Sequence, residues 1–217
     1  MTETTATKRF IAIAGNVGVG KSTLTELLSR SLGWQPFPEA VDENPYLSDF
    51  YKDMRHWSFH SQIFFLSRRL RHHRQLLDHP TSVVQDRSVY EDAEIFALNL
   101  FNQAHMDARD YRSYRELYEV LTSFLPPPDL VVYLQATVDT LLRRIRRRGR
   151  DYEQDIRPEY LTQLNELYES WIDSFDMCPV LTVPADDLNW VDNGEHLELV
   201  IKKIQEKLSG KEIVVFD

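Results

Sequence analysis

The sequence contains one cysteine, Cys178, and no apolar run long enough to cross a membrane. A single cysteine excludes an intramolecular disulfide and is typical of a reducing compartment. The first apolar run, residues 10–14, is far shorter than a membrane span, and residues 1–7 lack the apolar centre of a signal peptide. We therefore expect a soluble, cytoplasmic protein with no membrane partner.

An excess of positive charge is also lacking, because 34 acidic residues outnumber 25 lysines and arginines and the formal net charge is -9. Affinity for a nucleic-acid backbone depends on such an excess, so no nucleic-acid partner is expected. A small polyanion such as ATP needs only a local basic site. The chain has no internal repeat, low-complexity tract or Gly/Ser linker, and 42% of its residues are hydrophobic. We expect a single domain spanning residues 1–217.

Residues 15–22 place glycines, a lysine and a hydroxyl at phosphate-binding spacing. Glycines let successive backbone N–H groups turn toward phosphates, the lysine reaches the outer phosphates, and the serine hydroxyl binds Mg²⁺. An apolar run precedes the loop and leucines at helical spacing follow it, which places a helix N-terminus under the phosphates. The sequence therefore predicts a nucleotide-binding P-loop made of Gly15, Asn16, Val17, Gly18, Val19, Gly20, Lys21, Ser22 and Thr23.

Short apolar runs alternate with helical periodicity along the rest of the chain, which predicts an α/β protein with a parallel sheet covered on both faces. Strands are expected at residues 10–14, 34–39, 82–86, 129–134 and 179–183. Helices are expected after the P-loop and at 58–77, 90–104, 111–124, 138–148, 158–175 and 194–208. Ligands of such sheets bind beyond the carboxyl ends of the strands. Residues 212–216 form either an edge strand or a packing arm.

Carboxylates follow two of the expected strands. Glu39 comes just after the second strand, which places it near the P-loop as a general base for a hydroxyl; a surface or capping glutamate is the alternative. Asp86 ends the third strand, where it can hold Mg²⁺ or its waters, and Arg87 beside it can bind phosphates. An ordinary turn after a strand would have the same pattern.

Residues 143–150 contain six arginines among eight residues. One interpretation is a solvated helix face or an RNA-binding stretch, which the lack of interleaved aromatics and the negative chain disfavour. The other is a mobile lid over a bound nucleotide, whose guanidinium groups stabilise charge on the transferred phosphate. The presence of a P-loop favours the lid.

Two helical faces can line a base pocket. Gln62 and Arg69 are seven residues apart, and Asp92 and Phe96 are four apart, so each pair shares a face. A carboxamide, a guanidinium and a carboxylate beside an aromatic plane can recognise the edge of a nucleobase. Spacing by itself favours surface salt bridges and core packing for these residues.

Several separate motifs fall in order along the chain. They are Gly15–Ser22, Glu39, Tyr51–Asp53, Trp57–Phe59, Gln62, Asp86–Asp92, and Arg148–Arg150 with Glu153. Together these motifs resemble those of the deoxynucleoside kinases, and the resemblance covers residues 10–171. It implies a P-loop kinase fold with an Arg-rich lid at about 143–155, and transfer of a phosphoryl group from a nucleoside triphosphate to the 5′-hydroxyl of a deoxyribonucleoside, with Mg²⁺.

The resemblance also implies a role for each matching residue. Glu39, Arg87 and Lys21 are catalytic, and Glu39 and Arg87 also bind substrate: Glu39 is the base on the 5′-hydroxyl, and Arg87 is its neighbour, fixing it and contacting phosphate. Ser22 and Asp86 hold the metal. Those that bind the nucleoside are Tyr51 and Glu153 at the 3′-hydroxyl, and Gln62, Arg69, Asp92 and Phe96 at the base. The lid arginines are Arg144, Arg148 and Arg150.

Substrate choice follows in part from the same resemblance. A thymidine-selective pocket has little use for both Arg69 and Asp92 near the base edge, and residues 42–47 resemble bacterial deoxyadenosine and deoxyguanosine kinases. Asp86 stands where many animal members have glutamate, so its contact with Mg²⁺ is either direct or through water. We expect deoxyadenosine as the first substrate, with deoxyguanosine and deoxycytidine behind it.

Two other functions stay open at this point. A nucleoside monophosphate kinase shares the P-loop, the Asp-Arg pair and the basic lid, but needs extra cations for the phosphate of its acceptor. A nucleotide-binding subunit without turnover is open to any P-loop fold. The resemblance further implies a homodimer formed by helices between Ser58 and Phe124.

Overall fold

The computed structural model describes residues 7–39, 44–153, 156–188 and 194–209. Its centre is a parallel sheet with the strand order β2-β3-β1-β4-β5. The strands are β1 (Phe10–Gly15), β2 (Gln35–Phe37), β3 (Val83–Asp86), β4 (Leu130–Gln135) and β5 (Val180–Pro184). All five strands expected from the sequence are therefore confirmed. β2 is short and contains Pro36, which an edge strand tolerates because one side of its backbone needs no partner.

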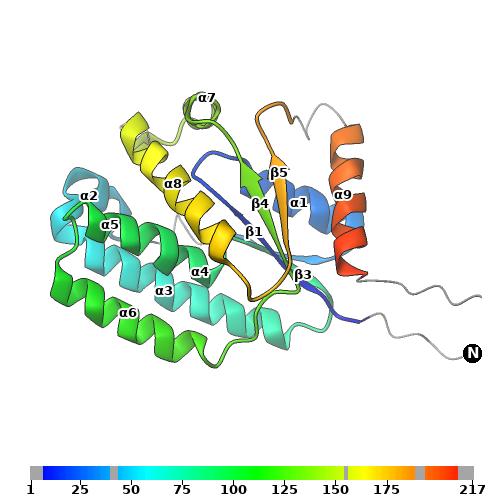
Figure 1. Cartoon of the computed structure of the whole chain (residues 1–217), viewed down its shortest axis with the longest axis horizontal. Helices are drawn as coiled ribbons and strands as arrows, with labels where there is room; N and C mark the ends of the chain where they lie inside the picture. Colours follow the sequence, from blue (N-terminus) through cyan, green and yellow to red (C-terminus); the bar gives the residue numbers. More distant parts are fainter. Residues whose placement is uncertain (1–6, 40–43, 154–155, 189–193, 210–217) are drawn as a thin grey trace, which may run out of the picture.

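Helices cover both faces of the sheet (Figure 1). One face is covered by α1 (Lys21–Leu32) and α9 (Gly194–Leu208). The other side carries α3 (Met54–Asp78), α6 (Ala108–Thr122) and α8 (Pro158–Ser174), with α7 (Val138–Arg148) at the carboxyl end of the sheet. Alternation along β1 explains both layers, because Ile11 and Ile13 pack in the first core and Ala12 and Ala14 in the second.

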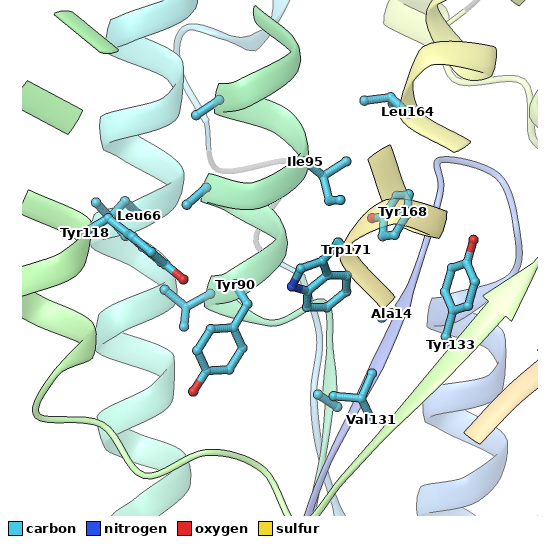
Figure 2. Close-up of a cluster of buried hydrophobic side chains, with 14 of the residues drawn as sticks. Ala14, Leu66, Tyr90, Ile95, Tyr118, Val131, Tyr133, Leu164, Tyr168 and Trp171 are labelled. Atoms are coloured by element: carbon cyan, nitrogen blue, oxygen red, sulfur yellow. The ribbon is translucent and has the colours of Figure 1, made fainter. Parts of the chain in front are cut away.

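The second core is rich in tyrosine. Tyr133 from β4 stacks on Tyr168 from α8, with 5.7 Å between the ring centroids, and Trp171 lies beside them (Figure 2). Leu66 from α3 and Tyr118 from α6 extend the same cluster away from the sheet. This core fixes α8 against the carboxyl end of the sheet, where the P-loop begins.

The helix expected at residues 90–104 differs in detail from the prediction. It consists of α4 (Val89–Glu91), a π-helical segment η1 (Asp92–Ala97) and α5 (Leu98–Asn102). π-helical turns insert an extra residue per turn and are frequent at functional sites.

Two short elements were not expected from the sequence. α2 (Leu47–Lys52) precedes α3, and a single 3₁₀ turn η2 (Asp151–Glu153) follows α7. The other expected helices are present, with ends that shift by a few residues. The tail at 212–216, residues 42 and 43, and residues 154–155 of the lid lie outside the described residues. None of the helices in the described ranges is long and apolar enough to span a membrane.

Candidate active site

A cavity of about 720 Å³ opens at the carboxyl ends of the strands. Most of the residues expected to bind ligands line it together. They are Val17, Gly18, Val19, Gly20, Lys21, Ser22, Thr23, Glu39, Tyr51, Gln62, Arg87, Asp92, Phe96, Arg144, Arg148, Arg150 and Glu153. Gly15, Asn16, Arg69 and Asp86 are buried behind that wall, and the last three contact it.

The loop between β1 and α1 has the conformation of a phosphate cradle. Gly15 has a φ of +142°, and a Cβ there would lie 2.6 Å from the Leu134 carbonyl oxygen. Gly18 has a φ of +83°, and a Cβ there would lie 2.7 Å from Cγ1 of Ile145 on α7. Both positions therefore require glycine, because a side chain would clash as well as strain the backbone. The loop is thus packed directly against the lid helix.

Asn16 anchors the same loop to α8. Its side-chain amide donates to the Leu161 carbonyl at 3.0 Å and to Oδ1 of Asn165 at 2.8 Å, and its Oδ1 accepts from the N–H of Val17 at 2.7 Å. Lys21 reaches back over the loop and donates to the Asn16 carbonyl at 3.0 Å.

Lys21 is 6% exposed. Burial, and then the charge of Arg87, lower the pKa of its ammonium group to about 8, although the nearby carboxylates oppose the shift. An anionic phosphate in the cradle would reverse that shift by stabilising the charged form.

Ser22 and Asp86 form a pair suited to a hard cation. The Ser22 hydroxyl donates to Oδ2 of Asp86 at 2.6 Å, while Oδ1 is buried without a hydrogen-bond partner among the described residues. Burial raises the pKa of Asp86, and Lys21 opposes that shift. An orphaned carboxylate oxygen beside a hydroxyl fits Mg²⁺ chemistry. Among the described residues no three His, Cys, Asp or Glu side chains are grouped so that they could hold a metal ion, so a cation here would take its other ligands from water and phosphate.

Two arginines flank the Glu39 carboxylate. Its Oε1 lies 2.6 Å from Nε of Arg87, and Nη2 of Arg69 donates to the same oxygen at 3.2 Å. The Arg87 contact is an ion pair, since its N–H is not aligned for a hydrogen bond. Burial would raise the pKa of Glu39, but Arg87 and Arg69 outweigh it and lower the pKa to about 2. Glu39 is therefore ionised throughout the neutral range.

Arg87 is held on every side. Its backbone has a φ of +66°, the left-handed region that is uncommon outside glycine, and its N–H donates to the Ile13 carbonyl at 3.0 Å. Its guanidinium carbon lies 4.3 Å from the centroid of the Phe96 ring, and Nη1 donates to the hydroxyl of Tyr168 at 3.0 Å. Burial would lower its pKa, yet Glu39, Tyr168 and Glu91 raise it well above the usual value.

The part of the cavity expected to hold the nucleobase, its base side, combines polar and aromatic groups. Gln62 is buried, and its Oε1 has no hydrogen-bond partner among the described residues. Asp92 and Phe96 reach the cavity from the π-helical segment. Leu47, Phe50 and Phe65 supply apolar walls that sequence reasoning missed, because periodicity does not separate cavity-lining from core residues.

Arg69 lies behind the cavity wall. Its Nε donates to Oδ2 of Asp92 at 3.1 Å, and its Nη1 donates to the Asp86 carbonyl at 3.1 Å. Together with the bond to Glu39, these contacts make Arg69 a link between the base side and the carboxylate beside the P-loop. Burial raises the pKa of Asp92, and Arg69 opposes the shift.

The arginines expected to form a lid have partners in this structure. Arg144 donates to the carbonyls of Val19, Ala185 and Leu188. Arg148 and Arg150 both pair with Glu153, whose side chain is only 4% exposed. Tyr51 lines the cavity from α2.

Sequence reasoning also missed Glu91 and Tyr168, which contact Arg87 from behind. The spacing of Ser88 and Glu91 is a capping box, a helix-start pattern that can be recognised in the sequence. No such local pattern connects Tyr168 to Arg87.

Comparison with known proteins gives consistent matches. The chain is 40% identical to the deoxyadenosine/deoxycytidine kinase of Bacillus subtilis (strain 168) over 196 residues, 89% of this chain and 90% of that protein. It is 36% identical to the deoxyadenosine kinase of Lactobacillus acidophilus, covering 91% of this chain and 95% of that protein.

The fold matches a solved structure of deoxyadenosine kinase from M. mycoides with bound dATP, with a TM-score of 0.80 and 33% identity over 91% of this chain and 99% of that chain. These likenesses confirm the P-loop kinase fold. The family model described as "Deoxynucleoside kinase" matches residues 11–209. The chain therefore belongs to the deoxynucleoside kinase family.

Proposed function

We propose that this kinase transfers the γ-phosphoryl group of ATP to the 5′-hydroxyl of deoxyadenosine, with deoxyguanosine and deoxycytidine as weaker acceptors. The observation that carries the proposal is the position of Glu39. Its carboxylate lines the same cavity as Lys21 and Ser22 of the P-loop and as Gln62 and Phe96 of the base side. A nucleoside bound between the P-loop and the base side would place its 5′-hydroxyl next to both the terminal phosphate and the Glu39 carboxylate.

In the proposed reaction the 5′-oxygen attacks the γ-phosphorus, and the bond between that phosphorus and the oxygen bridging to the β-phosphate breaks. The hydroxyl proton passes to Glu39, and ADP leaves. Because Arg87 and Arg69 keep the pKa of Glu39 at about 2, the carboxylate is a weak base. This suits a loose transition state, in which the proton is lost late and positioning with charge compensation supplies most of the catalysis.

Cations around the cradle compensate the phosphate charge. Lys21, Arg87 and the lid residues Arg144, Arg148 and Arg150 line the cavity with the P-loop amides. Ser22 and Asp86 would hold Mg²⁺, which supplies Lewis-acid neutralisation of the phosphate oxygens when bound.

Deoxyadenosine is favoured by the base side and by the relatives. Oε1 of Gln62, which lacks a partner in the described ranges, suits an amino group on a base edge. Asp92 with Arg69 adds a second polar pair, and Phe96 offers a stacking surface. Tyr51 and Glu153 would bind the 3′-hydroxyl. Glu153 is paired with Arg148 and Arg150, so substrate binding would have to share or displace those contacts.

Initial rates with ATP and each of the four deoxynucleosides, together with deoxyadenosine monophosphate, test this proposal. We expect the highest kcat/KM with deoxyadenosine and no turnover of the monophosphate. Thymidine as the best acceptor would contradict the specificity. Turnover of the monophosphate alone would identify a nucleoside monophosphate kinase, and binding without turnover of any acceptor would identify a nucleotide-binding subunit.

The proposal extends to a cytoplasmic homodimer. Leu117, Val120 and Phe124 form an apolar stripe along α6 and its end, and Phe124 is 79% exposed. Exposed apolar patches of this kind mark interaction surfaces. Light scattering should give twice the monomer mass of 25.6 kDa, and Val120→Asp should reduce it.

A further inference from the structure

Glu91 is a carboxylate with no exposed surface that the proposed reaction does not use. It is the third residue after the N-cap Ser88, and its Oε2 accepts from the Ser88 N–H at 2.7 Å and from the Ser88 hydroxyl at 3.2 Å. A capping box works equally well at the protein surface. Because burying a carboxylate is costly without compensating partners, capping alone does not account for this position.

The second oxygen of Glu91 joins two distant segments. Its Oε1 accepts from the N–H of Gly15 at 3.2 Å and from the hydroxyl of Tyr168 at 2.8 Å. Gly15 begins the P-loop, and Tyr168 lies on α8 in the tyrosine-rich core (Figure 2). One buried carboxylate thus holds the start of the phosphate cradle and the core helix behind it.

Tyr168 connects this carboxylate to Arg87. Nη1 of Arg87 donates to the Tyr168 hydroxyl at 3.0 Å, and that hydroxyl donates in turn to Glu91. Nη1 of Arg87 also lies 3.8 Å from Oε1 of Glu91, so the negative charge acts directly as well. The guanidinium therefore has Glu39 on its cavity side and Tyr168 with Glu91 on its core side.

The backbone at Arg87 gives a reason for such support. Its left-handed φ of +66° costs free energy in a residue with a Cβ and persists only where neighbouring contacts impose it. The Glu91 capping box begins at the next residue, and the hydrogen bond to Gly15 ties that turn to the P-loop.

We propose that Glu91 and Tyr168 form a buried brace that sets the position of the Arg87 guanidinium relative to the P-loop, and that both are positioning residues for phosphoryl transfer. The inference rests on the proposed function. Without the Tyr168 hydroxyl, Nη1 of Arg87 loses its core-side hydrogen bond and keeps only the longer ion pair with Glu91, so the guanidinium shifts toward Glu39. The substrate-binding contacts stay in place, so the loss appears in kcat rather than in KM.

Tyr168→Phe tests the brace, with Tyr90→Phe as its matched control. Tyr90 is buried in the same core and adjoins Glu91, but its hydroxyl has no hydrogen-bond partner in the described part of the chain and points away from Tyr168 (Figure 2). We expect Tyr168→Phe to lower kcat roughly 10- to 100-fold, with both KM values within about twofold of the wild type. Tyr90→Phe should keep the wild-type kcat, and melting temperatures report whether each variant is folded.

A double-mutant cycle with Arg87→Lys separates positioning from general destabilisation. If Tyr168 acts through Arg87, Tyr168→Phe should lower the single-turnover rate much less in the Arg87→Lys background than in the wild type. Equal fold-losses in the two backgrounds, or an unchanged kcat in Tyr168→Phe, would overturn the brace. If Tyr168→Phe does not fold, Glu91→Gln serves as the second test. It keeps the side-chain shape and removes the charge, and it should lower kcat in the same way. An inactive wild type would instead refute the proposed function, so the two failures are distinguishable.

Discussion

Nε of Arg87 lies 2.6 Å from Oε1 of Glu39, in an ion pair that is largely shielded from solvent and borders the cavity. The pair joins the residue after β3 to the residue that follows β2 by two positions. Its electrostatic effect is to keep Glu39 ionised and to bring a guanidinium next to the site of the proposed phosphoryl transfer.

Removing the charge of Glu39 should abolish turnover without abolishing nucleotide binding. Glu39→Gln keeps the volume of the side chain, but an amide cannot accept the hydroxyl proton, so kcat should fall about 100-fold or more. Calorimetric titration should show ATP affinity within a few-fold of the wild type, because the P-loop contacts are unchanged. A variant with wild-type kcat would exclude Glu39 as the base.

The affinity for ATP should decline as the pH rises through about 8. The pKa of Lys21 is lowered to about 8, mainly by burial, so its ammonium group is charged below that pH and neutral above it. The charged form binds the phosphates, and bound phosphate raises the pKa, which by linkage makes ATP binding weaken at high pH. ATP dissociation constants measured between about pH 6.5 and pH 9.5 check this. Lys21→Arg should remove the alkaline decline, since arginine keeps its charge over this range.

A methyl group at position 18 should be more harmful than one at position 33. Both glycines have positive φ angles, +83° and +68°. Replacing either one by alanine should lower the free energy of unfolding by about 1–2 kcal/mol, because alanine is strained in this backbone conformation. A Cβ at Gly18 also meets Ile145 of the lid helix at 2.7 Å, whereas nothing lies within 4 Å at Gly33. Gly18→Ala should therefore weaken ATP binding and unfold at lower urea concentration than Gly33→Ala. Similar ATP affinities in the two variants would contradict the packing of the P-loop against α7.

His73 should make the protein less stable in mild acid. The residue is 1% exposed, and its Nε2 has no hydrogen-bond partner among the described residues. Burial lowers the pKa of the imidazole, opposed by a hydrogen bond to the Pro126 backbone. The unfolded chain takes up the proton near pH 6.5 and the folded chain does so only at lower pH, so stability is full above about 6.5 and is lost as the pH falls below it.

Urea unfolding at several pH values measures this effect. The free energy of unfolding of the wild type should fall more steeply between about pH 7 and pH 5 than that of His73→Phe, because phenylalanine at position 73 takes up no proton. His56→Gln is the control, because it removes an exposed histidine and leaves the buried one in place. Parallel pH profiles for the wild type and His73→Phe would exclude His73 as the cause.

Local sequence patterns were sufficient to predict most of the architecture. The P-loop, the five strands and nearly all helices follow from short-range regularities: apolar runs, helical periodicity and the fixed spacing of Gly15, Gly18 and Lys21. Since parallel strands place their carboxyl ends at one edge, the same patterns predicted that Glu39 and Arg87 would lie near the P-loop, and both line its cavity.

The tertiary structure decided what those residues touch. The link from Asp92 through Arg69 to Glu39 and the brace from Arg87 through Tyr168 to Glu91 join side chains from separate elements. Periodicity assigns a face to each element but not the partner that the face meets, and the hydrogen bond between Gly15 and Glu91 spans 76 residues. The sequence patterns also did not predict the π-helical turn that begins at Asp92, because its extra residue is imposed by packing rather than by composition. Sequence alone therefore determined the fold and the set of polar groups at the site, and the packing of α3, α4 and α8 around them determined how those groups are paired and charged.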